Sequence, residues 1–170
     1  MKHELRTNIT KPTQPLHLIM NRYQIDPPID ADTRDEKGQV IARAVLSASQ
    51  RDINKIELLG LTDMLKREGE GDEIDTITEG SGIVVDEMEL YGMVCGTPEN
   101  IEAILSLFSG ALFKAVFYDS EGDIIFARHD SSMMDFYLDD DEFDEFTRVI
   151  SEEEQRIVEQ RPIESQQTPH

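Results

Sequence analysis

Residues 96–110, GTPENIEAILSLFSG, carry the strongest local signal in the chain, and the fold is decided around them. Thr97 is a favourable helix N-cap, Pro98 suits the first helical position, and Glu99 lies near the positive end of the helix dipole. Apolar residues then recur with helical spacing at Ile101, Ile104, Leu105 and Phe108. Because Gly110 suits a C-terminal cap, the pattern predicts one helix between Thr97 and Gly110.

Strands are predicted on both sides of this helix. Upstream, one face of an extended segment holds Met88, Leu90, Gly92 and Val94, and the other holds Glu87, Glu89, Tyr91 and Met93. Downstream, residues 113–118 and 124–127 are predicted strands around the turn sequence DSEGD at 119–123. Residues 83–129 therefore have the order β-α-β-β. This order is typical of an α+β fold, with two to four helices on one face of a small, mainly antiparallel sheet.

Two further helices are predicted upstream of this segment. Thr33 and Ser49 each stand three residues before an acidic residue, which is the spacing of a capping box. Apolar residues at helical spacing follow each of them. Helices are therefore predicted over residues 34–48 and from Ser49 to just before Gly69, although one long kinked helix would give a similar pattern.

A last helix is predicted to begin near Leu138. Acidic residues at 139–142 suit its positive N-terminal end. Its buried stripe is expected at Phe143, Phe146, Ile150 and Ile157.

The rest of the chain gives weaker signals. The apolar residues 16–20 predict a short strand, and the Gly-rich, acidic residues 68–82 predict a loop. Residues 1–15 are expected to be a flexible arm and residues 161–170 a disordered tail. Residues 16–160 are then expected to form a single α+β domain.

The chain is strongly acidic, with 36 Asp and Glu against 16 Lys and Arg and a net charge of −20. Phosphate backbones and anionic membranes repel such a surface, so we expect neither direct nucleic-acid binding nor membrane binding. The sequence has no apolar run near the roughly 20 residues of a membrane span, and its N-terminus lacks the apolar segment of a signal peptide. We therefore expect a cytoplasmic protein and, for any interaction, a partner with a basic surface.

The negative charge is concentrated in the C-terminal third. Residues 119–154 hold fourteen Asp or Glu and two Arg, a subtotal of −12. Aromatic residues that could anchor a partner are interleaved with them. We predict that this region docks a basic protein partner. The predicted contacts are Asp139, Asp140, Asp141, Glu142, Phe143, Asp144 and Glu145.

Alternatives remain for this acidic region. The helical stripe also favours a core position for Phe143, and the acids could form a solvated face that serves only solubility. A sharper alternative is nucleic-acid mimicry, in which the carboxylates imitate phosphates and inhibit a DNA- or RNA-processing enzyme. Duplex DNA carries one charge per roughly 1.7 Å of axis, a density that residues 139–145 approach over a short distance. The sequence leaves the partner and the oligomeric state open.

A small enzyme is the alternative from a different class. Cys95 lies between a predicted strand and a helix N-terminus, a placement found in reactive cysteines. A nucleophile also needs a base, for which His17 and His129 are the candidates. We favour an inert thiol buried in the core, because a free cysteine is among the most often buried residues. As the only cysteine, Cys95 cannot form an intrachain disulfide or a Cys-based zinc site within one chain.

Metal and phosphate sites are also considered. Asp119, Glu121 and Asp123 alternate as in a calcium loop, with Asp130 at the twelfth position, but Ile124 stands where an EF-hand needs glycine. A Gly-containing hairpin turn is therefore preferred, although a metal bound by other carboxylates stays an alternative. The glycine pairs at 69–71 and 80–82 lack the phosphate-binding pattern. We expect no catalytic residues, metal or cofactor, and predict a non-enzymatic interaction or regulatory protein.

Overall fold

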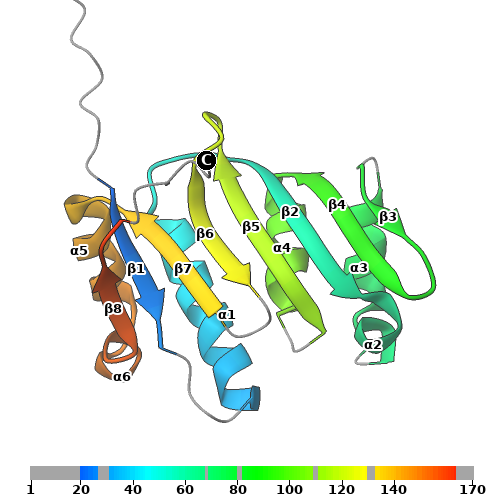
Figure 1. Ribbon diagram of the computed structural model, residues 1–170, viewed down its shortest axis with the longest axis horizontal. Helices are drawn as coiled ribbons and strands as arrows, with labels where there is room; N and C mark the ends of the chain where they lie inside the picture. Colours follow the sequence, from blue (N-terminus) through cyan, green and yellow to red (C-terminus); the bar gives the residue numbers. More distant parts are fainter. Residues whose placement is uncertain are drawn as a thin grey trace, which may run out of the picture.

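The described part of the chain forms one antiparallel sheet and a layer of helices (Figure 1). The computed structural model describes residues 20–26, 31–67, 69–79, 82–108, 111–129 and 133–163. Its strands are β1 (Asn21–Ile25), β2 (Ile53–Leu61), β3 (Val84–Val85), β4 (Glu89–Cys95), β5 (Leu112–Asp119), β6 (Ile124–His129), β7 (Met133–Leu138) and β8 (Val158–Arg161). Its helices are α1 (Ala31–Ala48), α2 (Thr62–Arg67), α3 (Gly71–Thr78), α4 (Pro98–Ser106), α5 (Asp140–Val149) and α6 (Glu152–Gln155).

The sheet confirms the predicted α+β fold and is larger than predicted. Its eight described strands follow the order β3-β4-β2-β5-β6-β7-β1-β8, and every neighbouring pair is antiparallel. β2 lies between β4 and β5, with Leu58 opposite Gly92 on one side and Ala115 on the other. The predicted β-α-β-β segment is therefore present, with β2 inserted between its first two long strands.

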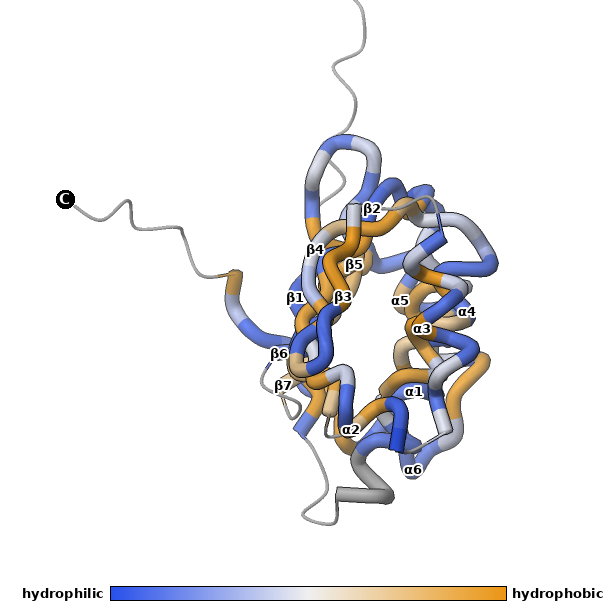
Figure 2. The backbone as a smooth tube through the Cα atoms, turned by 90° about the vertical axis from the view of Figure 1, so that its right-hand side faces the viewer, coloured by the Kyte–Doolittle hydropathy of each residue, from blue (hydrophilic) through white to orange (hydrophobic). Residues whose placement is uncertain are grey.

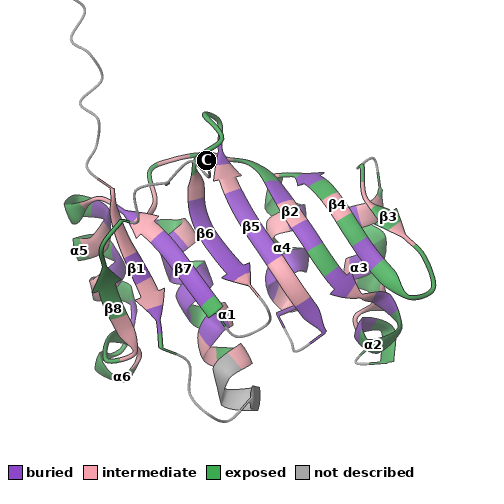
Figure 3. Ribbon diagram, in the orientation of Figure 1, coloured by how far each residue is buried: buried purple, intermediate pink, exposed green. Residues whose placement is uncertain are grey.

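All the described helices lie on one face of the sheet, and no described helix lies on the other, which we call the uncovered face (Figures 1 and 2). Alternation along the strands accounts for this arrangement, because successive side chains point to opposite faces. In β2, Leu58 points to the helices and is 2% exposed, whereas Leu59 points away from them and is 38% exposed. The same alternation continues in β4, where Leu90 and Val94 are buried and Tyr91 and Met93 are exposed (Figure 3).

The main apolar core lies between the sheet and the helices. Its largest fully buried apolar side chains include Phe117, Phe126, Phe136 and Phe146. Apolar residues of α1 and α4, such as Ile41, Val45 and Ile104, are buried in the same cluster. None of the helices in the described ranges combines the length and the apolar content needed to cross a membrane.

One basic side chain is buried between the two layers. Arg128 of β6 is 0% exposed, and its Nη2 donates to Asp35 Oδ1 of α1 at 3.0 Å. Its Nε donates to the Leu112 carbonyl oxygen, and its guanidinium lies 5.0 Å from the centre of the Phe108 ring. A buried guanidinium needs such partners, because removal from water is costly for an unpaired charge.

The two helices with the strongest local signals are confirmed. The helix predicted over 34–48 is α1, and the helix predicted after Thr97 is α4. The Thr97 side chain accepts a hydrogen bond from the Asn100 amide at 3.2 Å, as an N-cap does. Gly110, the predicted C-terminal cap, lies outside the described residues.

The helix predicted from Ser49 to just before Gly69 is wrong. Residues 53–61 form strand β2, and only the short α2 follows it. The apolar residues of this segment fit both spacings, because Ile53, Ile56 and Leu59 are three apart while Ile56 and Leu58 are two apart. Hydrogen bonding to a strand on each side favours the extended form, which no local pattern reveals.

Other elements also differ from the prediction. The expected loop at 68–82 contains α3, whose Ile74 and Ile77 are buried in the core. Strands β1 and β7 were not predicted, yet they pair with each other along their whole length. In the expected turn at 119–123, by contrast, the structure has the β5–β6 hairpin, and Gly122 adopts a φ of 87° that favours glycine.

The predicted final helix is shorter than expected. α5 ends at Val149, Ser151 caps the one-turn α6, and residues 158–161 form β8 along β1. Ile157 therefore precedes a strand instead of extending the helical stripe. Arg161, the predicted start of the tail, belongs to β8. The predicted arm at 1–15, and the predicted strand at 16–20 except Met20, lie outside the described residues, as do residues 164–170.

Candidate functional site

The acidic residues predicted as a binding site lie at the start of α5, and two of them hold the helix end. The Asp139 carboxylate accepts from the Glu142 amide at 2.8 Å, and the Glu142 carboxylate accepts from the Asp139 amide at 2.9 Å. Glu142 also accepts from the Gln50 amide at 2.8 Å and is only 1% exposed. This capping box gives Asp139 and Glu142 a structural role and removes Glu142 from the accessible surface.

Phe143 lies against the core, which is the alternative that its helical stripe favoured. Its ring stacks on Tyr23 of β1, with centroids 4.1 Å apart and planes 1° apart. It also contacts Phe146, whose centroid is 5.6 Å away. Phe143 is half-buried, so its aromatic surface joins α5 to the sheet.

The remaining four acids of the predicted site are exposed: Asp140, Asp141, Asp144 and Glu145. Their spacing along the helix places them on one outer side of α5. Asp140 accepts a hydrogen bond from the Asn21 side chain at 2.8 Å, and Glu145 pairs with Arg148 at 2.8 Å. Within the described residues, neither Asp141 nor Asp144 has a Lys or Arg partner.

These acids act on a nearby titrating group. Burial raises the pKa of the Tyr23 phenol, and the carboxylates of Asp140, Asp144 and Asp139 raise it further. Negative charge next to a phenol disfavours its ionised form, so these carboxylates add to the larger effect of burial.

Comparison with protein-family models, curated proteins and solved structures finds no match to this chain. Functional inference therefore rests on the chemistry of its surfaces.

The exposed charge differs between the two layers of the molecule. The described helices carry twelve exposed Asp or Glu and only four exposed Lys or Arg. On the uncovered face of the sheet, the charged side chains of the described strands are four acidic and four basic. They are Glu57, Glu89, Asp135 and Glu159, with Arg22, Lys55, Lys114 and Arg161. The helical layer therefore carries net negative charge, and the uncovered sheet face carries none.

Six of the eight charged side chains counted on the uncovered face form ion pairs with one another, and Lys55 and Glu89 do not. Lys114 Nζ lies 2.6 Å from Glu57 Oε1, and the Tyr118 hydroxyl donates to Glu57 Oε2 at 3.0 Å. Arg22 pairs with Asp135 at 3.3 Å on neighbouring strands. The Lys114 hydrogen bond holds the pKa of the Glu57 carboxyl below its usual value, while burial and the Glu57 hydrogen bond raise the pKa of the Tyr118 phenol.

The structure does not bring the candidate catalytic residues together. Cys95 lies at the end of β4, as predicted, but it is exposed and points to the uncovered face, so the expectation of a buried core thiol is wrong. His129 ends β6 and is more than about 14 Å away, because three strand spacings separate β4 from β6 and His129 lies toward the opposite end of its strand. That separation is too large for a hydrogen-bonded nucleophile and base. His17 lies outside the described residues.

The candidate calcium loop has a structural explanation. The Asp119 carboxylate accepts from the Glu121 and Asp123 amides, each at 2.9 Å, and pairs with Arg51 at 3.3 Å. It thus stabilises the hairpin that the sequence predicted. Asp130 lies outside the described residues. In the ranges that the structure describes, no three His, Cys, Asp or Glu side chains are grouped so as to hold a metal ion.

The strongest apolar surface was missed at the sequence level. Four apolar side chains of β2, β3 and β4 lie on the uncovered face: Leu59, Val84, Tyr91 and Met93, which are 38%, 46%, 43% and 36% exposed. The signal for half of this set was present in the alternation of residues 87–94, which places Tyr91 and Met93 on the outward side. Leu59 could not be placed, because its strand was predicted as a helix.

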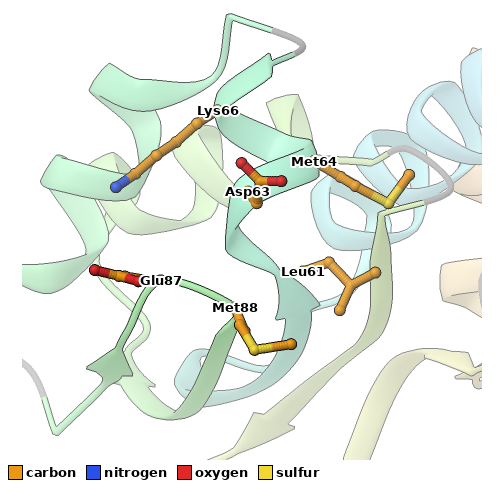
Figure 4. A pocket seen from close by; sticks show the side chains of 6 residues that line it. All are labelled: Leu61, Asp63, Met64, Lys66, Glu87 and Met88. Atoms are coloured by element: carbon orange, nitrogen blue, oxygen red, sulfur yellow. The ribbon is translucent and has the colours of Figure 1, made fainter.

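A shallow groove of about 580 Å³ continues this surface at the end of β2 (Figure 4). Leu61, Met64 and Met88 provide its apolar lining, and Asp63, Lys66 and Glu87 its charged groups. Leu61 is two residues from Leu59 and therefore lies on the same face of β2.

Proposed function

We propose that this protein is a non-enzymatic binding protein that docks a basic surface of a partner protein on the exposed acids of α5. The observation that carries the proposal is the placement of Asp140, Asp141, Asp144 and Glu145 on one exposed side of a single helix. Solubility alone needs net charge but not this grouping. The first-turn acids suit the positive end of the helix, but the like-charge pairs four residues apart, Asp140 with Asp144 and Asp141 with Glu145, disfavour it. A cationic partner surface would relieve the repulsion and gain charge-assisted hydrogen bonds.

The charge difference between the two layers supports the same proposal. A field that is negative on one side orients an approaching basic protein before contact, which raises the association rate. Binding of this kind weakens as salt increases, because the Debye length falls from about 30 Å at 0.01 M to about 8 Å at 0.15 M.

The test is capture of proteins from cell extract at 50 and 500 mM NaCl, concentrations on either side of about 0.15 M physiological ionic strength. Immobilised wild-type protein is compared with the α5 variant Asp140→Asn/Asp141→Asn/Asp144→Asn/Glu145→Gln. We expect a basic protein to bind at low salt and to be released at high salt, and its binding to the α5 variant to be lost.

A matched control variant removes four exposed acids elsewhere in the helical layer, Asp72→Asn/Asp75→Asn/Glu99→Gln/Glu102→Gln. It has the same net charge as the α5 variant, so it should retain the partner. Equal loss in both variants would show that only total charge matters. That result, or no basic protein at either salt, contradicts the proposal.

Nucleic-acid mimicry is the second candidate within this class. Four acids between positions 140 and 145 span about 7.5 Å of helix axis, close to the charge spacing of duplex DNA. If mimicry is correct, the captured protein binds nucleic acid, and added duplex DNA displaces it from wild-type protein. A captured protein that DNA does not displace leaves ordinary protein docking as the proposal.

The rival enzymatic candidate uses the Cys95 thiol or a carboxylate-bound metal. The exposed position of Cys95 supports access to it, while the distance to His129 counts against an activated nucleophile. A thiol that reacts with iodoacetamide at the rate of a free cysteine would count against a cysteine enzyme. Unchanged thermal stability after treatment with chelator would count against a structural metal.

A further inference from the structure

The uncovered face of the sheet is the second surface that needs an explanation. We define the apolar strip as Leu59, Val84, Tyr91 and Met93. Strand pairing makes it continuous, since Tyr91 lies opposite Val84 in β3 and opposite Leu59 in β2, and Met93 lies two residues along β4 on the same face. Ten large hydrophobic side chains of the described residues are exposed. Four of them form the strip, and two more, Met64 and Met88, line the groove next to it at the end of β2. Such clustering is typical of an interaction surface, because single exposed apolar residues are normally scattered.

We propose that the apolar strip is the contact through which two copies of this chain form a dimer, with their sheets stacked face to face. The helical layers then lie outside, and their acidic surfaces point away from each other. This inference is independent of the proposed function, because it uses the opposite face of the sheet.

Charge is the reason for choosing a second copy as the occupant. Two chains of net charge −20 repel each other, and the repulsion is greatest when the acidic helices approach. The uncovered face has four acidic and four basic side chains, so two copies can meet there without opposing net charge. Lys114 pairs with Glu57 within the face, so of the four charged side chains that β4, β2 and β5 place there, Lys55 and Glu89 are desolvated on contact without an ion-pair partner.

The size of the uncovered face determines how strong a dimer we expect. Four adjacent strands, β3, β4, β2 and β5, span about 19 Å at the spacing of a sheet, and a seven-residue strand is about 23 Å long. The flat area is therefore about 440 Å² per copy, and the accessible area that follows the side chains is larger. Two copies bury roughly 1,000–1,200 Å², at the lower limit of specific interfaces. We therefore expect a concentration-dependent dimer with a dissociation constant of micromolar order.

The dependence on salt distinguishes the dimer contact from docking of a basic partner on α5. Dimerisation brings two negatively charged molecules together, so screening by salt should strengthen it. Docking of a basic partner on α5 should instead weaken with salt. The two contacts therefore respond in opposite directions to the same change.

The test is sedimentation equilibrium of the full chain between 2 and 200 μM protein, concentrations that bracket a dissociation constant of about micromolar order. It is carried out at 50 and 500 mM NaCl, on either side of about physiological ionic strength. We expect a monomer–dimer equilibrium whose dimer fraction rises with salt. The variants Leu59→Glu and Tyr91→Glu each place a like charge in both copies at the strip, and each should weaken the dimer at least about tenfold. Both sites are exposed, so the variants should fold, which far-UV circular dichroism checks.

The control is Val149→Glu on α5, a 61% exposed apolar residue outside the strip. It adds the same charge and should leave the dissociation constant within about twofold. A wild-type protein that stays monomeric at 200 μM in 500 mM NaCl overturns the proposal. So does a dimer that Leu59→Glu, Tyr91→Glu and Val149→Glu weaken equally, since total charge and not the strip would then control association.

Discussion

The two faces of the sheet come from alternate residues of the same strands, yet they have different surroundings. Most described side chains that point to the helices are apolar and buried, and Arg128 among them is held by Asp35. Side chains that point away from the helices include the ion pairs and the apolar strip. The difference indicates that stability depends mainly on the covered face, whereas the uncovered face and the outer surface of the helices are available for contacts. Four tests examine this division.

The largest effect is expected for Arg128→Met on the covered face. The substitution leaves the Asp35 carboxylate, which is 17% exposed, without its guanidinium partner between the layers. We expect a loss of about 3–5 kcal/mol in the free energy of unfolding, measured by urea denaturation. The double variant Arg128→Met/Asp35→Leu should recover much of this loss, because an apolar pair needs no counter-charge. A loss below about 1 kcal/mol in the single variant would show that the ion pair is not needed for stability.

Neighbouring leucines in β2 give the most direct comparison of the two faces. Leu58→Ala removes a side chain that is 2% exposed and should cost about 2–5 kcal/mol. Leu59→Ala removes one that is 38% exposed and should cost less than about 1 kcal/mol. Both values come from urea unfolding at a protein concentration below the dimer range. Equal costs would contradict the assignment of Leu59 to an uncovered surface.

A smaller effect should separate two kinds of acid within the predicted binding site. Glu142→Ala leaves the amides of Asp139 and Gln50 without an acceptor and should cost about 1–3 kcal/mol. Asp141→Ala, one residue away on the exposed side, should change stability by no more than about 0.5 kcal/mol. Thermal unfolding of the two variants in parallel measures the difference. A larger loss of stability in Asp141→Ala than in Glu142→Ala would contradict the structural role assigned to the capping box.

The smallest effect concerns pH and the paired charges of the uncovered face. The hydrogen bond from Lys114 lowers the pKa of the Glu57 carboxyl in the folded state, so this pair stabilises the fold above the unfolded pKa of about 4.3. The contribution is lost as the pH falls through the lower, folded-state pKa. Because both side chains are 34% exposed, it should amount to less than about 1 kcal/mol. Urea unfolding of wild type and Glu57→Gln should therefore differ at pH 7 and converge near pH 3; a constant difference would contradict this account.

Elements with local signals could be predicted from the sequence. The cap at Thr97, the proline at 98 and the apolar stripe of α4 all lie within one short segment, and the structure has the predicted helix. The β5–β6 hairpin likewise follows from the turn residues between its strands. The α+β class could be predicted because these elements alternate in a recognisable order.

The errors arise where distant segments decide the conformation. β2 is extended because β4 and β5 pair with it, although its apolar residues also fit a helix. β8 pairs with β1 from the other end of the chain, and four residues carry too little pattern to predict it. The sequence therefore underestimated the sheet, and with it the area of the uncovered face.

The candidate site could likewise be predicted from the sequence only in part. Composition was enough to find the acidic segment, but not to tell its exposed acids from the buried one. Asp139 and Glu142 have the spacing of a capping box, so their role in capping α5 could have been predicted from the sequence. The contact between Glu142 and the Gln50 amide depends on the packing of the loop after α1 against α5, which only the fold reveals.

The separation of charge between the layers also gives the molecule a permanent electric dipole. Its negative end lies on the helices, so a positively charged resin or electrode should hold the protein with the helices toward the support. The uncovered sheet would then face the solution, together with the thiol of Cys95. The native chain could thus be immobilised in one orientation without an engineered tag, with its single thiol on the side that faces the solution.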